Sequence, residues 1–172
     1  PATYIVLPKL RFDPQGRATV AWLEDLGGQD TLYVSQWNGK TWQALGGRIN
    51  GAGKWASFAS LAFDIKGQPI VAWIEGEDGA RKVRAARWKA DTDSTNSSVN
   101  SGGQWLSLGP ENAANKALNT RAGTDATHAS IAANQQGILV TWRESQAGTQ
   151  AADTQVKPVK PPTWTLETKL FR

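Results

Sequence analysis

Three glutamates occupy the same place in a repeated pattern, each two residues after a tryptophan. The pairs are Trp22 and Glu24, Trp73 and Glu75, and Trp142 and Glu144. Residues two apart in a β-strand share a face, so each carboxylate points the same way as its indole. One hypothesis is a ring of carboxylates at a channel mouth, which would bind a cation or a polyhydroxy ligand. The other is that each glutamate accepts hydrogen bonds from the turn amides of a neighbouring repeat, and the recurrence favours this structural role.

Trp55 is the tryptophan that the repeat explains least. It lies in a linker of glycine, lysine and alanine. The tryptophans that recur in register are instead expected to be core, namely Trp22, Trp73, Trp142, Trp42, Trp105 and Trp164. An exposed indole can stack on the apolar face of a sugar, but it can also pack as a structural staple. We predict that Trp55 and the three glutamates lie nearest to any small ligand. Trp55→Ala should then abolish ligand quenching of tryptophan fluorescence with little change in the melting temperature.

Few residues in the chain suggest catalysis or metal binding. His128 is the single histidine, and the sequence has no cysteine, so a transition-metal site and a thiol nucleophile are not expected. Asp125 and Ser130 lie near His128, but this spacing does not define a triad, which is a matter of geometry. We predict no catalytic residue, no metal and no cofactor.

A basic cluster lies between the second and third repeats of the pattern. It consists of Arg81, Lys82, Arg84, Arg87 and Lys89. Along a strand these side chains divide between both faces, which makes a poor continuous phosphate track. A charged edge paired with the nearby acids Glu75, Glu77 and Asp78 is the favoured interpretation, and contact with an anionic partner is the alternative.

The repeat itself predicts an all-β fold. Each copy has an aspartate or asparagine three residues before a glycine, at Asp13, Asp64 and Asn134, which is typical of a turn between strands. Four short strands per copy then follow from the alternating pattern and from a second conserved tryptophan at Trp42, Trp105 and Trp164. We predict one segment over residues 1–172 with units at about 3–46, 57–109 and 127–170. In the third unit the strand before Trp164 is poorly specified, because residues 157–162 contain three prolines.

Length and composition set the remaining bounds. A chain of 172 residues can bury one substantial core, and its net charge of +4 is too small to indicate nucleic-acid binding. No apolar run is long enough to span a bilayer. The chain opens on Pro1 and contains no methionine, so we expect a processed N-terminus or a piece of a longer polypeptide, exported to the bacterial periplasm or the extracellular space.

The pattern D-x-x-G-x-x-x-V-A-W-x-E resembles the repeats of bacterial exported β-propeller proteins. It is also loosely similar to the Asp-box of sialidase-like and lectin-type propellers, although its aspartate and glycine are one residue further apart. The resemblance implies four-stranded propeller blades, three of them in this chain and therefore a partial ring. Further blades would come from self-association or from a longer parent chain.

These features together favour a non-catalytic binding module of a secreted protein. Its expected role is recognition of a glycan or another surface ligand at a propeller mouth or blade junction. A scaffolding subunit that docks onto a larger protein assembly is the alternative, and a glycosidase-like propeller enzyme is the second alternative.

Overall fold

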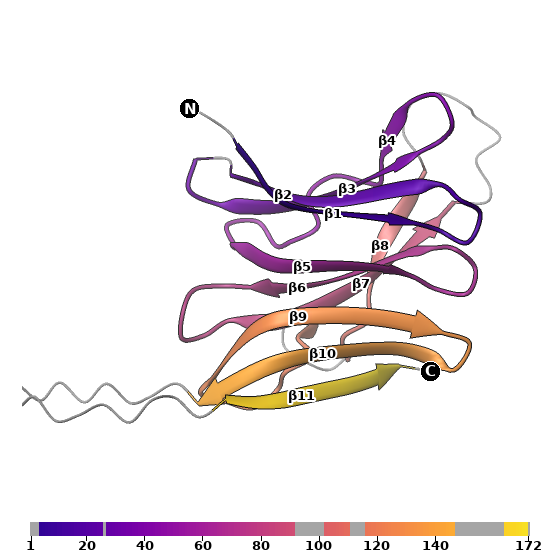
Figure 1. Ribbon diagram of the computed structural model, residues 1–172. Helices are drawn as coiled ribbons and strands as arrows, with labels where there is room; N and C mark the ends of the chain where they lie inside the picture. The colour runs from indigo at the N-terminus through magenta and orange to yellow at the C-terminus, as the bar shows by residue number, and fades with distance from the viewer. Residues whose placement is uncertain (1–3, 26, 92–101, 111–115, 147–163, 172) are drawn as a thin grey trace, which may run out of the picture.

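A computed structural model describes residues 4–25, 27–91, 102–110, 116–146 and 164–171 of the chain. These residues form eleven β-strands and no α-helix, arranged as three antiparallel sheets in chain order (Figure 1). The all-β prediction is therefore confirmed. Over the described part of the chain, no helix has the length and apolar character needed to cross a membrane.

The first two sheets each contain four strands that pair in sequence order. Sheet 1 consists of β1 (Tyr4–Phe12), β2 (Ala18–Asp25), β3 (Asp30–Trp37) and β4 (Trp42–Ala44). Sheet 2 consists of β5 (Ala56–Phe63), β6 (Pro69–Glu75), β7 (Lys82–Ala90) and β8 (Gly103–Ser107). The pairing registers of the first three strands agree when 51 is added to the residue number, so that Val20 and Val71 are equivalent. The sequence repeat is therefore a structural repeat.

The third sheet differs from the prediction of a four-stranded unit. It has three strands in the described residues: β9 (Thr124–Asn134), β10 (Gly137–Gln146) and β11 (Trp164–Phe171). The Trp164 segment was expected as a fourth, closing strand, but it pairs directly with β10, and Ser145 is opposite Trp164. Proline cannot donate to a ladder, so the proline-free run from Trp164 onward suits this place better. Residues 157–162, where a third strand was sought, lie outside the described residues.

The three sheets stack face to face, with sheet 2 in the middle (Figure 1). One apolar cluster joins sheets 1 and 2 and includes Leu23, Leu32 and Trp73. A second cluster joins sheets 2 and 3 and includes Ile74, Val83 and Trp142. All seven residues of β6 are buried because both of its faces are covered. The core thus lies between sheets and not within any one of them.

The turn between the first two strands of each sheet is fixed by its Asp or Asn. Asp13 Oδ1 accepts the backbone N–H groups of Gln15 and Arg17 at 2.9 and 2.8 Å. Asp64 Oδ1 accepts those of Lys66 and Gln68, both at 2.9 Å. Both aspartates are buried, which explains why a short acceptor recurs there. The predicted turn role is confirmed.

An ion pair joins sheet 2 to sheet 3. Asp125 of β9 accepts hydrogen bonds from the backbone N–H of Gly79, at 3.1 Å, and from the backbone N–H of Arg81, at 2.9 Å. The guanidinium of Arg81 binds both carboxylate oxygens. Burial raises the pKa of Asp125, but these hydrogen bonds outweigh burial and hold the pKa below its usual value. The carboxylate is therefore stabilised in its charged form.

We expect Asp125→Asn to lower the free energy of unfolding at pH 7 by about 2–3 kcal/mol, since it removes the buried partner of Arg81 and leaves only the exposed Asp78. Because the pKa of Asp125 is lower in the folded than in the unfolded state, its carboxylate stabilises the fold at a pH above the unfolded-state pKa, near 3.9. This stabilisation is lost as the pH falls through the folded-state pKa, so the unfolding free energies of the two proteins should begin to converge below about pH 3.9 in urea titrations. Asp78→Asn is the matched control, because Asp78 pairs with the same arginine while 93% exposed, and its loss should be much smaller. A constant difference across pH would contradict this role.

Candidate functional site

The Glu75 carboxylate is hydrogen-bonded to other groups of the protein. Its side chain is buried and accepts hydrogen bonds from Gly51 N at 2.9 Å, from Trp73 Nε1 at 3.3 Å and from Arg84 Nε at 3.1 Å. Gly51 belongs to the connection that leads out of sheet 1, so this glutamate bonds a neighbouring unit's loop amide. The contacts match the structural role that the recurrence favoured.

Glu144 and Glu24 occupy the equivalent places in sheets 3 and 1. Glu144 is buried and accepts a hydrogen bond from Trp142 Nε1 at 3.0 Å and another from the Thr124 hydroxyl. Glu24 is half-buried on the outer face of sheet 1, beside Trp22. Each carboxylate lies on the tryptophan face of its own sheet, so the three carboxylates lie in successive layers of the stack. The geometry does not bring them together around one small molecule.

Trp55 is exposed, as predicted, with 53% of its surface accessible. It precedes β5, and its carbonyl accepts a hydrogen bond from Gly76 N at 3.0 Å. This places Trp55 beside the end of β6, one pairing step from Glu75. Of the four predicted ligand-binding residues, the structure brings together only these two.

A repeated β-bulge marks a site that the motif search missed. In each sheet, two residues of the first strand lie opposite the single tryptophan of the second strand. The first bulge residue has a positive φ in every case: 50° at Leu7, 48° at Phe58 and 56° at His128. Side chains other than glycine avoid this conformation, and such strain often accompanies binding sites.

The three bulge residues line one groove along the first strands of the sheets. β1 lies beside β5, and β5 lies beside β9 (Figure 1). The groove has a volume of about 360 Å³, and its lining includes Leu7, Phe58 and His128 together with Lys9, Arg11 and Ser130. We call it the inner groove. The rings of Phe58 and His128 are 4.3 Å apart between centroids and tilted by 32°, so they form one aromatic surface.

The charge of the inner groove has one sign. Lys9 and Arg11 are exposed, and no aspartate or glutamate is among the described residues that line the groove. His128 adds a ring nitrogen that can donate or accept. The groove therefore combines hydrogen-bond donors, cations and an aromatic surface, which suits an anionic ligand with an apolar face.

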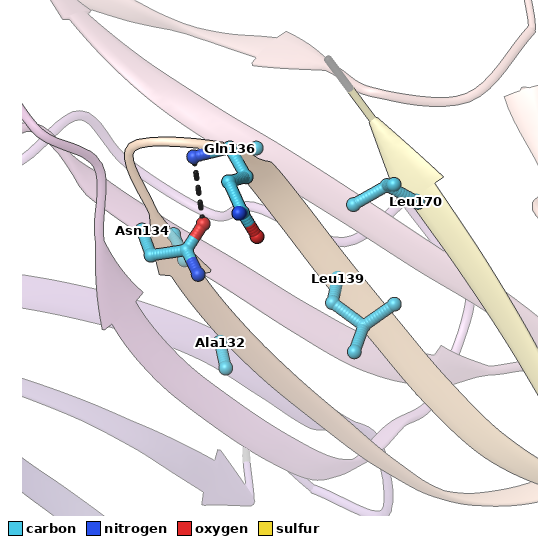
Figure 2. Close-up of a pocket in the computed structure, with 7 residues that line it drawn as sticks. Ala132, Asn134, Gln136, Leu139 and Leu170 are labelled. Atoms are coloured by element: carbon cyan, nitrogen blue, oxygen red, sulfur yellow. Dashed lines mark hydrogen bonds between the residues drawn. The ribbon is translucent and has the colours of Figure 1, made fainter.

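A second hollow lies at the turn between β9 and β10, on the outer face of sheet 3 (Figure 2). Leu139 and Leu170 lie at its side, and the Asn134 side chain accepts a hydrogen bond from Gln136 N at 2.8 Å (Figure 2). Asn134 is thus occupied in holding its turn, as Asp13 and Asp64 are. No charged side chain lines this hollow among the described residues, and it offers less chemistry than the inner groove.

The outer face of sheet 1 carries several large apolar side chains that are exposed. Phe12 is 67% exposed, Ile5 is 63% exposed and Leu10 is 52% exposed. Trp42 of β4 is 49% exposed, which corrects the expectation that every tryptophan repeated in register is core. The physical reason is that the equivalent Trp105 packs against the preceding sheet, and no described strand packs on this face of sheet 1. We call this surface the open face.

The bulge residues could have been found by extending the repeat upstream. Leu7, Phe58 and His128 each lie six residues before the turn Asp or Asn, and are followed by Pro-Lys-Leu, Ala-Ser-Leu and Ala-Ser-Ile. Because their side chains differ, they form no motif by residue type. Only the shared backbone conformation makes them equivalent.

Two glycine substitutions on β1 test the strain at the bulge. Leu7 and Leu10 are 54% and 52% exposed, but only Leu7 has a positive φ. Leu7→Gly should leave the free energy of unfolding nearly unchanged, because relief of a strain of about 1–2 kcal/mol offsets the entropy cost of glycine. Leu10→Gly should destabilise by about 1 kcal/mol or more in urea denaturation, since no strain is relieved. Equal losses in the two variants would mean that the bulge stores no strain.

A scan against protein-family models and a search of curated proteins found no match to this chain. Its function is therefore inferred from the geometry of its own residues.

Proposed function

We propose that this chain is a non-catalytic binding module of an exported protein, and that it recognises an acidic glycan in the inner groove. The observation that supports it is the convergence of three strained bulge residues on one groove with Lys9 and Arg11. A bulge re-aims the side chain that it carries, and here three sheets aim one side chain each at the same place. Repeated strain at a shared groove is a typical feature of a binding site.

The chemistry of the groove suits a sugar acid. The apolar face of a pyranose can rest on Leu7 and on the Phe58 and His128 rings. A carboxylate or sulfate of the same ligand would pair with Lys9 and Arg11, where Arg11 favours a bidentate arrangement. The Ser130 hydroxyl is exposed at the same edge and can bond a sugar hydroxyl.

The lining favours binding over hydrolysis. Glycoside hydrolysis ordinarily uses two carboxyl groups that flank the scissile bond. The described lining of the inner groove contains none, and the buried Glu75 and Glu144 are bonded within the stack. The glycosidase-like alternative therefore has no support from this groove.

Binding can be measured calorimetrically with galacturonic-acid and sulfated galactose oligomers against a neutral galactose oligomer of equal length. We expect the acidic oligomers to bind more tightly, with an affinity that falls as salt screens the cations. Replacing both Lys9 and Arg11 with glutamine should weaken binding at least roughly tenfold, since each lost ion pair in a groove contributes about 1 kcal/mol or more.

The matched control replaces Lys40 and Lys66 with glutamine, which removes the same net charge from two exposed turns. This control should retain the affinity of the unmodified chain. Equal weakening in both double variants would indicate attraction by net charge alone. Failure of every acidic oligomer to bind would refute the proposal.

A second candidate function is that of a scaffolding subunit that docks onto a larger protein assembly. The observation that favours it is the open face, because soluble monomers rarely expose contiguous apolar patches of this kind. Docking would cover Trp42 and Phe12 while leaving the rest of the surface accessible.

Oxidative footprinting compares the purified chain with the same chain in its native assembly. Trp42 and Trp55 are a matched pair, with exposed fractions of 49% and 53%. We expect Trp42 to become protected in the assembly while Trp55 reacts as before. Unchanged reactivity of Trp42 would exclude docking through the open face.

A further inference from the structure

The open face of sheet 1 reproduces the surface with which sheet 2 packs on sheet 1. Val71 and Trp73 of β6 lie in the apolar cluster between those two sheets, and their equivalents on the open face are Val20 and Trp22. On the first strands, Leu61 of the same cluster corresponds to the exposed Leu10. The side chains therefore agree in type and register, although the described strands cover only one of the two surfaces.

The last two strands of sheet 1 and of sheet 2 carry a pair of tryptophans in the same geometry. Trp88 and Trp105 of sheet 2 have ring centroids 5.4 Å apart and planes inclined by 60°. Trp37 and Trp42 of sheet 1 have centroids 5.7 Å apart and planes inclined by 60°. The pair on the open face is thus already arranged as the packed pair is, without a neighbour to arrange it.

The packed pair shows what such a surface accepts. Trp105 Nε1 donates a hydrogen bond to the carbonyl of Leu45, at the end of sheet 1, at 2.7 Å. The following Gly46 lies so close that an added Cβ would be 3.2 Å from the Trp88 ring. A Leu–Gly turn, with a free carbonyl and no side chain at the glycine, is therefore the complement of the tryptophan pair.

An indole on the open face lacks a partner that its equivalents possess. Trp73 Nε1 and Trp142 Nε1 donate to Glu75 and Glu144. Trp22 Nε1 is buried and has no hydrogen-bond partner among the described residues. In sheet 2 the Glu75 carboxylate accepts a hydrogen bond from Gly51 N of the preceding connection, and the residues that the structure describes provide no equivalent connection beside Glu24. A preceding loop would complete this arrangement.

The far face of sheet 3 does not supply the complement. Sheet 1 packs against sheet 2 through Ala21 and Leu23, and sheet 2 packs against sheet 3 through Ala72 and Ile74. At the equivalent places sheet 3 has Thr141 and Arg143, and Arg143 is exposed. A second copy docked head to tail would therefore place polar groups against the tryptophans.

We infer that the open face binds a further antiparallel β-sheet from outside these 172 residues, whose face carries alanine, leucine and valine and whose edge ends in a Leu–Gly turn. That sheet would pack as sheet 1 packs on sheet 2. The carbonyl of its Leu–Gly turn would accept a hydrogen bond from Trp42 Nε1. A backbone N–H of the connection after that turn would donate to Glu24 and hold its carboxylate beside the Trp22 indole. This inference is independent of the inner groove.

A tandem extension of the full chain tests the inference directly. Residues 4–55, which include sheet 1 and its connection, are placed a second time before residue 4, so that the added sheet presents the inferred complement. We expect Trp42 to lose its oxidative reactivity and to react as slowly as Trp105. The midpoint of urea unfolding should rise above that of the unextended chain.

The control extension carries Leu23→Lys and Gly46→Val in the added copy only. It should fold poorly onto the chain and leave Trp42 as reactive as before. If the unaltered extension also leaves Trp42 reactive, the open face does not accept such a sheet and the inference fails. A stable dimer of the unextended chain with Trp42 protected would likewise overturn it, because the occupant would then be a second copy.

Discussion

The structure depends on one packing constraint: where two sheets meet, the tryptophan face of one packs against the aliphatic face of the other. In sheets 2 and 3 the face with the repeated tryptophan covers the preceding sheet, and in sheets 1 and 2 the face with small and branched aliphatic side chains packs against the following one. Large flat indoles fill space well against small side chains, whereas two indole faces would leave gaps or clash. Strand β6 shows both kinds of contact, since one of its faces packs on sheet 1 and the other on sheet 3, and all of its residues are buried.

The bulge and the inner groove follow from the same packing. Each repeated tryptophan lies opposite two residues of the first strand, where the extra residue bends the strand beside the indole. The cost is a residue with positive φ, such as Phe58, whose side chain lines the inner groove and also packs against the core between sheets 2 and 3. A backbone feature required for packing thus presents three variable side chains in one row. The packing also explains the glutamates, because Glu75 lies between two sheets and is neutralised there by Arg84.

Much of the fold could be predicted from the sequence because turns and alternation are local. The pattern from Asp64 to Glu75 specifies a buried turn acceptor, a glycine with a φ of 75° and a strand with two apolar faces. Trp55 could also be predicted as exposed, since no repeat explained it. The rest depends on contacts between distant segments. Trp42 has the same local sequence signal as Trp105, but it is exposed because no described strand packs against its face of sheet 1. The bulge at His128 is set by register across two strands, which no residue type encodes.

The two ends of the stack differ in a way that gives it a direction. At the sheet 3 end, Thr141 and Arg143 replace the alanine and the aliphatic residue that the other sheets offer to a follower. At the sheet 1 end, the tryptophan face is kept in full, together with the indole geometry of a packed interface. The exposed Phe12 and Trp42 make this end of the stack apolar, and such side chains promote aggregation when they remain uncovered. The two ends of the stack therefore differ in surface chemistry: the sheet 3 end presents Thr141 and Arg143, and the sheet 1 end presents the Trp37 and Trp42 rings.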